Sequence, residues 1–124
     1  MTAMHEDEVL AANEAFYRAF DDGDREAMRR LWAGRAPVVC VHPGGAAIIG
    51  REAVLASWDA ILGAPTRPAI VCLSPNALCY DGFALVSCVE RLSGGVLVAT
   101  NGFVLEDGVW RMALHQAGPA PGGR

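Results

Sequence analysis

The residue with the clearest chemical potential in this sequence is His42. It ends the short apolar run Val38-Val39-Cys40-Val41 and is followed by Pro43-Gly44-Gly45, which breaks the strand. A titratable side chain at the end of an apolar strand is costly to bury unless a partner or a reaction uses it. Because an imidazole gains and loses protons near neutral pH, His42 is a candidate general acid or base.

Two further polar side chains interrupt apolar, strand-like segments closer to the C-terminus. They are Glu90, in the segment 83–92, and Asn101, in the segment 96–106. Burial raises the proton affinity of a carboxylate, and a side-chain amide can donate a hydrogen bond to a developing oxyanion. His42, Asn101 and Glu90 therefore form the predicted catalytic set. The predicted substrate-binding residues, which shape the pocket, are Trp58, Tyr17, Phe16, Trp32, Phe103 and His115.

Each of these residues also has a purely structural interpretation. His42 can donate to a neighbouring backbone carbonyl, as many histidines at strand ends do. Glu90 can pair with Arg51 or Arg91, and Asn101 can bond to a bulged strand. The tryptophans can simply fill the core. The residues alone leave these alternatives open, because the joint arrangement depends on the register of the strands.

Other reaction types have no matching motif. There is no Gly-x-Ser-x-Gly sequence and no phosphate-binding glycine loop. His5, expected to be exposed to solvent near the N-terminus, lacks metal-ligand spacing with His42 and His115, so neither a metal nor a cofactor is expected. The cysteines have no Cys-x-x-Cys spacing and are expected to be buried, reduced thiols; they are Cys40, Cys72, Cys79 and Cys88.

The composition indicates one compact domain. The chain has 124 residues, of which 52% are hydrophobic, and a net charge of −4. The acidic balance excludes nucleic acid and anionic membrane surfaces as partners, and no apolar run reaches the roughly 20 residues that span a bilayer. The acidic start of the sequence has no leader pattern, so a cytoplasmic protein is expected. We expect a single domain over 1–124, with an ordered core of about 6–118 and a Gly/Pro tail over 119–124.

Periodicity predicts the elements that position the candidate residues. Helices are expected over 6–22, over 25–32 with Asp24 as N-cap, and over 51–62. Strands are expected over 38–42, 69–80, 83–92, 96–106 and 109–117, with Pro75 marking a bulge or an edge. Helices followed by an antiparallel meander predict an α+β fold, a curved sheet wrapped over a helical layer.

The connectors Gly94-Gly95 and Asp107-Gly108 predict the register of the last three strands. As two-residue loops, they place Glu90 opposite Ala99 and Asn101 opposite Leu114. Alternation then puts Glu90 and Asn101 on the inner face and His115 on the outer face, although one bulge would reverse His115. The outer face mixes apolar and charged residues, as a face covered by a second subunit does.

Over roughly residues 8–119 the chain resembles the SnoaL-like branch of the nuclear transport factor two-like superfamily. The resemblance rests on the motifs quoted above, together with Gly50-Arg51-Glu52-Ala53-Val54, Ser57-Trp58 and Gly108-Val109-Trp110-Arg111-Met112. The resemblance implies a cone-shaped α+β barrel with a deep pocket, usually a homodimer joined through the sheets. It also implies that His42-Pro43 occupies the position of the catalytic base of steroid isomerases of this fold. Asn101 falls at the position of their acidic oxyanion donor, and their tyrosine donor falls at Phe16, beside Tyr17.

Two functions follow from this resemblance. The first is a cofactor-independent isomerase, cyclase or dehydratase, distinct from the steroid isomerases, acting on a small apolar carbonyl or hydroxyl compound. The alternative is a non-catalytic small-ligand-binding or dimerisation module. A cavity of roughly 300 Å³ or more with His42 inside favours the first, and a filled interior favours the second.

Overall fold

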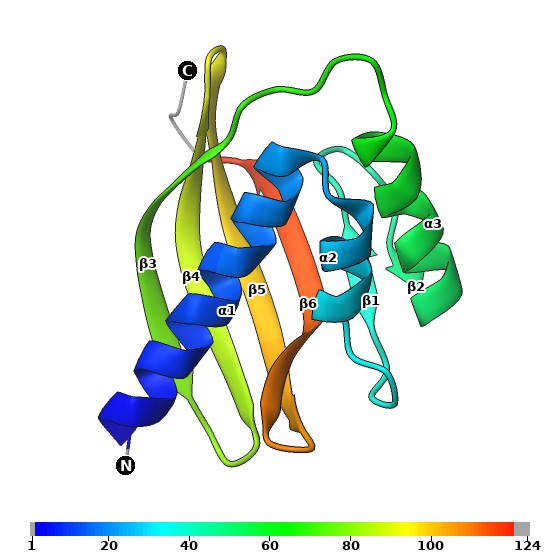
Figure 1. Ribbon diagram of the computed structural model, residues 1–124. Helices are drawn as coiled ribbons and strands as arrows, with labels where there is room; N and C mark the ends of the chain where they lie inside the picture. Colours follow the sequence, from blue (N-terminus) through cyan, green and yellow to red (C-terminus); the bar gives the residue numbers. More distant parts are fainter. Residues whose placement is uncertain (1, 121–124) are drawn as a thin grey trace.

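The computed structural model describes residues 2–120, and side-chain environments from residue 5. Three helices pack against one curved sheet, and the longest crosses its concave side (Figure 1). The helices are α1 (Thr2–Asp22), α2 (Arg25–Leu31) and α3 (Arg51–Leu62). The strands are β1 (Val39–Val41), β2 (Ile48–Ile49), β3 (Val71–Cys79), β4 (Phe83–Leu92), β5 (Gly95–Glu106) and β6 (Val109–Pro119). Of the tail predicted over 119–124, Pro119 belongs to β6, and residues 121–124 lie outside the described residues.

The predicted α+β class is confirmed, with one correction to the sheet. The strand order is β2-β1-β6-β5-β4-β3, so the sheet curves around the helices without closing on itself. β1 pairs with β6 in parallel, with Val39 opposite Leu114, so the sheet is mixed rather than wholly antiparallel. No hairpin joins these two strands, and therefore no local turn dictated their relative direction.

Local signals explain the helix boundaries. The carboxylate of Asp24 accepts the N–H of Ala27 at 3.0 Å, which confirms the predicted N-cap. Gly23 separates α1 from α2 with a φ of 66°, which favours glycine. α1 begins at Thr2, earlier than predicted, and its exposed His5 packs edge-on against Trp110. In the described part of the chain, no helix combines the length and apolarity needed to cross a membrane.

The predicted register of β4 with β5 is wrong by two residues. Leu92 faces Gly95, so Ser93 and Gly94 form the loop and Glu90 lies opposite Leu97 rather than Ala99. An even displacement keeps every side chain on its predicted face, since the side-chain period of a strand is two. Glu90 therefore still points toward the helices, where it is 3% exposed.

The register of β5 with β6 shifts by one residue, and this moves the His115 side chain from the predicted outer face of the sheet to the inner face. The Asp107-Gly108 turn pairs Glu106 with Val109 as predicted, but the pairing slips between Gly102 and Phe103. Asn101 therefore faces His115, not Leu114, and His115 turns inward to 3% exposure. Gly102 permits the close approach of Leu114, because a Cβ at Gly102 would lie 3.1 Å from the Leu114 Cβ. A second bulge, between Leu73 and Asn76, confirms the one predicted at Pro75.

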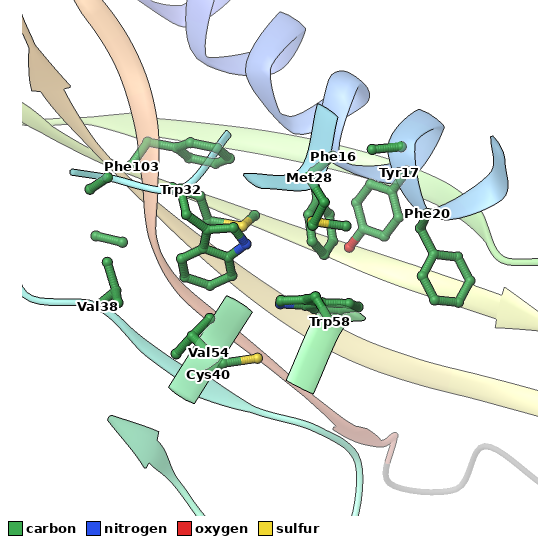
Figure 2. Close-up of a cluster of buried hydrophobic side chains, with 14 of the residues drawn as sticks. Phe16, Tyr17, Phe20, Met28, Trp32, Val38, Cys40, Val54, Trp58 and Phe103 are labelled. Atoms are coloured by element: carbon green, nitrogen blue, oxygen red, sulfur yellow. The ribbon is translucent and has the colours of Figure 1, made fainter. Parts of the chain in front are cut away.

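A cluster of large apolar side chains fills the space between the helices and the sheet (Figure 2). Trp32 comes from the end of α2 and Phe103 from β5, and each is 1% exposed. Phe16 packs edge-on against Trp58, with ring centres 5.4 Å apart. This packing fixes α1 and α3 relative to the sheet, and so fixes the side chains that they present toward His42.

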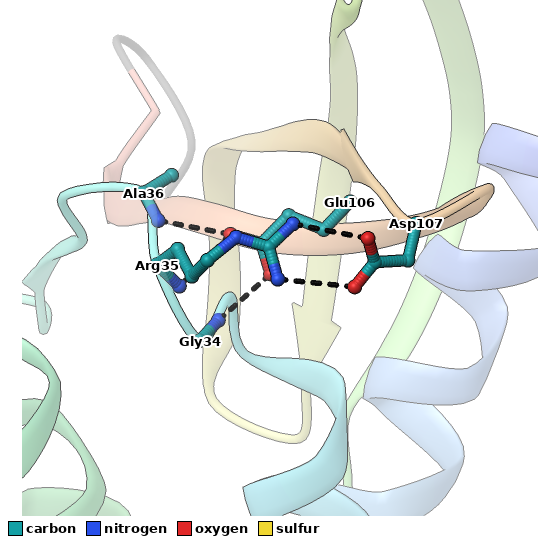
Figure 3. A network of polar contacts seen from close by, with 5 residues as sticks. All are labelled: Gly34, Arg35, Ala36, Glu106 and Asp107. Carbon is teal, nitrogen blue, oxygen red and sulfur yellow. Dashed lines mark hydrogen bonds and ion pairs between the residues drawn. The ribbon is translucent and has the colours of Figure 1, made fainter.

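A buried carboxylate holds the segment after α2 against the turn between β5 and β6. The two Glu106 oxygens accept the backbone N–H groups of Gly34, Arg35 and Ala36, each at 2.9 Å (Figure 3). Donation by Gly34 and Ala36 is the main reason that the pKa of Glu106 falls to about 2. Glu106 therefore anchors the chain just before β1, which carries His42 at its end.

Replacing Glu106 with glutamine is expected to lower the free energy of unfolding by about 2 kcal/mol at pH 7, because an amide cannot accept all three N–H groups. Because the folded-state pKa of about 2 lies below the usual 4.5, this contribution is complete above pH 4.5 and is lost as the pH falls toward 2. At pH 3.5 the difference should be about 1 kcal/mol smaller than at pH 7, as measured by urea unfolding.

Asp107→Asn is the matched control for this experiment. Asp107 pairs with Arg35 on the surface, at 3.0 Å, in the same turn. Exposed ion pairs contribute little, so this variant should change the free energy of unfolding by less than about 0.5 kcal/mol. An equal cost for Glu106→Gln at both pH values would contradict the assignment of Glu106 as an ionised clamp.

Candidate functional site

A cavity of about 190 Å³ opens at the end of the core, between helices α1 and α3 and the inner face of the sheet. Exposed Pro43 and Pro68 lie at its rim. The buried part of the lining is aromatic and polar, and consists of Phe16, Tyr17, Phe20, Trp58, Glu90 and His115. His42 lines the same cavity and is half-buried. The volume is below the roughly 300 Å³ typical of drug-sized ligand pockets, but the interior is not filled.

The hydrogen bonds of His42 assign its tautomer. Its Nε2 lies 3.0 Å from the Ser57 hydroxyl oxygen, and that hydroxyl donates its single proton to the backbone oxygen of Val54 at 2.8 Å. Ser57 can therefore only accept from His42, so Nε2 carries the ring proton and Nδ1 keeps its lone pair. Trp58 packs edge-on against the ring at 4.8 Å. His42 is thus held with its Nε2 protonated and its Nδ1 unprotonated.

His115 is assigned the opposite tautomer by Asn101. The Nδ2 group of Asn101 donates to the Asn13 side-chain oxygen at 2.8 Å and to the Tyr17 hydroxyl at 3.1 Å. Its Oδ1 therefore faces the Nδ1 of His115, 2.6 Å away, and accepts the proton there. This leaves the lone pair on Nε2 of His115, for which no partner is found among the described residues.

The network continues from Asn101 to a buried carboxylate. The Tyr17 hydroxyl accepts from Asn101 and donates to Glu90 Oε2 at 2.6 Å. A directed chain of hydrogen bonds therefore runs from His115 through Asn101 and Tyr17 to Glu90. The arginine pairing considered for Glu90 is absent among the described residues, since the Arg51 guanidinium binds backbone oxygens that include those of Trp32 and Ala33.

Burial dominates the electrostatics of this site. It lowers the pKa of His42, and it lowers the pKa of His115 to about 3 with a further contribution from nearby His42. Both imidazoles are therefore neutral at pH 7. Burial raises the pKa of Glu90 and that of Tyr17, and the Tyr17 hydrogen bond partly offsets the change at Glu90.

The structure brings some of the predicted site residues together and separates others. His42, Glu90, Trp58, Tyr17, Phe16 and His115 all line the cavity. Trp32 and Phe103 lie in the core instead. Asn101 is fully buried beneath the cavity, and both of its amide hydrogens are used by protein atoms, so it faces no substrate directly.

Two hydrogen-bonding residues of the site, Ser57 and Asn13, were not predicted from the sequence. Ser57 lies three residues after Val54 in α3, and Asn13 lies on the apolar stripe of α1. A polar residue on an apolar helical stripe is a usable signal, and Asn13 provides it at 2% exposure. Within residues 5–120, no group of three or more His, Cys, Asp or Glu side chains is placed to hold a metal ion.

Comparison with known proteins assigns the family. The sequence profile of the SnoaL-like domain matches residues 9–120. The chain belongs to the SnoaL-like family. The resemblance drawn from His42-Pro43-Gly44 and the neighbouring motifs is therefore confirmed. No curated protein matches the chain significantly.

Solved structures place this SnoaL-like chain among nuclear transport factor 2 (NTF2)-like folds. A candidate dehydratase of the NTF2-like family from Streptomyces avermitilis is 30% identical, with 98% of this chain and 99% of that chain covered and a TM-score of 0.89. A candidate calcium/calmodulin-dependent protein kinase type II association domain from Thiobacillus denitrificans is 32% identical, with 90% and 94% covered and a TM-score of 0.79. An NTF2-like protein of unknown function from Pseudomonas putida, 21% identical with 98% and 89% covered, superimposes with a TM-score of 0.85 and supports the fold.

Proposed function

We propose that this SnoaL-like protein is a cofactor-independent enzyme that moves protons on a small, mostly apolar carbonyl or hydroxyl compound, as an isomerase, cyclase or dehydratase. The observation that carries the proposal is His42. Its ring proton is held by Ser57, and its free lone pair belongs to a neutral imidazole that lines an apolar cavity. The 30% identical candidate dehydratase from Streptomyces avermitilis supports the same class of reaction.

The proposed reaction starts at Nδ1 of His42. This nitrogen accepts a proton from a carbon next to a carbonyl group of the bound compound, and the electron pair of the broken C–H bond moves to the carbonyl oxygen as an enolate. In an isomerisation the enolate takes the proton back from the imidazolium at another carbon. In a dehydration the electron pair expels a hydroxyl group from the neighbouring carbon, and this group leaves as water with the proton from His42. His115 is a weaker base because its pKa is about 3. We assign to Glu90 and His115 the role of orienting the compound, and to Asn101 that of orienting His115.

The size of the cavity restricts the compound. An apolar cavity of about 150 Å³ holds one benzene molecule. The cavity beside His42, at about 190 Å³, therefore suits a ring of six atoms with one or two substituents. A four-ring steroid is too large for this volume, which agrees with the replacement of the steroid isomerase base by His42.

The test is the exchange of carbon-bound hydrogen for deuterium. Monocyclic hydroxyketones and ketones are incubated with the protein in D₂O, and NMR follows the α-hydrogens together with any loss of water. We expect enzyme-dependent exchange whose rate is constant from about pH 8 to 6.5 and falls at lower pH, because the pKa of His42 is lowered from 6.5 and only the neutral ring accepts a proton. Exchange no faster than in buffer across the panel would contradict the proposal.

A non-catalytic role is the second candidate. Two observations favour it: the cavity volume is only about 190 Å³, and a 32% identical relative is a candidate kinase association domain. This reading predicts that small ring compounds bind without hydrogen exchange, or do not bind at all. The exchange experiment therefore separates the two functions.

The proposal includes a homodimer joined through the outer face of the sheet. This face exposes apolar side chains on strands β3 and β5, including Val71 at 44%, Leu78 at 50% and Val98 at 45%. Scattered exposed valines are ordinary, but several on one sheet face indicate a surface for a second copy. Sedimentation equilibrium at micromolar concentration should give twice the mass of one chain, and a monomer would contradict this part of the proposal.

A further inference from the structure

The polar atoms that the cavity offers to a ligand are hydrogen-bond acceptors. His42 donates its only ring proton to Ser57, which leaves Nδ1 as an acceptor whose one hydrogen-bonding neighbour among the described residues is the weakly donating Cys40 thiol, 4.0 Å away. His115 donates its only ring proton to Asn101, which leaves Nε2 as an acceptor. Both histidines line the cavity, so a ligand between them meets two lone pairs and no ring N–H.

The third polar group of the cavity has the same character. Glu90 lines the cavity at 3% exposure, and its Oε2 accepts the proton of Tyr17. Its Oε1 has no partner among the described residues, although buried carboxylate oxygens normally have one. The Tyr17 hydroxyl is committed to Glu90. The indole N–H of Trp58 has no hydrogen-bond partner among the described residues, but its nitrogen is fully buried and so is not open to a ligand in the cavity. No arginine side chain is among the residues that line the cavity within the described chain.

We infer that the cavity binds a small monocyclic alcohol or phenol, whose hydroxyl group donates its hydrogen bond to Glu90 or to one of the two histidines. This deepens the proposed function, on which it rests for the site, by requiring a hydroxyl group on the ring in addition to any carbonyl group that activates the C–H bond. A hydroxyl group supplies the donor that the walls lack. A ketone brings only another acceptor, and binding it strips water from buried acceptors without replacing the hydrogen bonds.

An ammonium group would also supply donors, but the surroundings disfavour it. The same burial that lowers the pKa of His42 and of His115 disfavours any positive charge placed between them. The other walls are apolar side chains, including Phe20, Ile61 and Leu92. Glu90 is the one acidic side chain of the lining, and the apolar walls and two neutral imidazoles offer a cation little else in place of water, so we expect a neutral donor to bind more tightly than a cationic one.

The experiment compares three ligands that share one ring and differ in one group: cyclohexanol, cyclohexanone and cyclohexylamine. Binding to the full chain at pH 8 is followed by tryptophan fluorescence, since Trp58 lines the cavity, and by isothermal titration calorimetry. We expect cyclohexanol to bind at least about tenfold more tightly than either of the others. Equal or tighter binding of the ketone or the amine, or no measurable binding of the alcohol, would overturn the inference.

Two variants test whether Glu90 is the group that causes the preference for the alcohol. Glu90→Gln replaces an acceptor oxygen with an N–H donor, and should reduce the preference for the alcohol over the ketone to less than about threefold. Arg91→Gln is the matched control, since it is the next residue on β4 and its side chain is exposed. It should keep the preference of the unchanged protein, and an equal loss in both variants would count against Glu90 as the recognition group.

Failure of this inference is distinguishable from failure of the proposed function. Preference for cyclohexanol without hydrogen exchange would support the inference about ligand recognition and contradict the proposed enzymatic function. Hydrogen exchange with a preference for cyclohexanone would support the enzymatic function and contradict the inference.

Discussion

Replacing His42 with glutamine is expected to lower the rate of hydrogen exchange at least about 100-fold, since a positioned general base contributes roughly 10² to 10⁴ in rate. Glutamine preserves much of the size and polarity of the histidine but cannot take up a proton at neutral pH. The rate is measured by deuterium incorporation at pH 7.5, with the fold checked by circular dichroism. His42 is half-buried at the rim, so the variant should remain folded.

Two further variants make this test specific. His5→Gln changes an exposed histidine on α1, outside the cavity lining, and should leave the rate unchanged. His42→Ala creates space beside Trp58, so added imidazole should restore part of the lost rate by occupying the position of the missing ring. An unchanged rate in His42→Gln would rule out His42 as the proton acceptor.

Replacing Asn101 with leucine is expected to lower the free energy of unfolding by about 4 kcal/mol. Leucine has the same number of side-chain heavy atoms and the same branching, but it removes both donors and the acceptor at the centre of the buried network. The Oδ1 of Asn13 and the Nδ1 proton of His115 would each lose the partner that Asn101 now provides. Each buried polar group left without a partner costs about 1 to 3 kcal/mol, as urea unfolding at pH 7 should show.

Glu52→Gln is the control for this variant. Glu52 lies on α3, away from the outer face of the sheet, and its side chain is exposed. A polar substitution at such a position should change stability by less than about 0.5 kcal/mol. A cost below about 1 kcal/mol for Asn101→Leu would contradict the account of Asn101 as the centre of a satisfied buried network.

Much of the fold could be predicted because its signals are local. The limits of α3 and of β4 agree with the prediction to the residue, since the glycine that precedes α3 and the apolar periodicity of each segment lie within a few positions. Asp24 was identified as an N-cap from its neighbours alone. β2 was missed because two residues, Ile48 and Ile49, are too short to show any period.

In the candidate site, too, the features that could be predicted are those with local signals. The sequence identified His42 as a titratable group at a strand end, and it placed Glu90 on the inner face even though its predicted partner was wrong. Side chains alternate between the two faces along a strand, so a displacement of two residues leaves Glu90 on the same face of the sheet. Phe16, Tyr17 and Trp58 could be assigned to inner helical stripes by their spacing, and they line the cavity.

What only the tertiary structure decided is how these groups are connected. One extra residue in β6, taken up where Leu114 packs on Gly102, turned His115 inward to meet Asn101. Ser57 and Asn13 orient the two rings through contacts between segments far apart in the chain. The position of a bulge depends on how side chains pack between neighbouring strands. A hydrogen bond such as these depends on which distant elements come together. Neither produces a local pattern in the sequence. Many of the residues that line the cavity could therefore be predicted from the sequence, whereas the hydrogen bonds that set the tautomers of the two histidines could not.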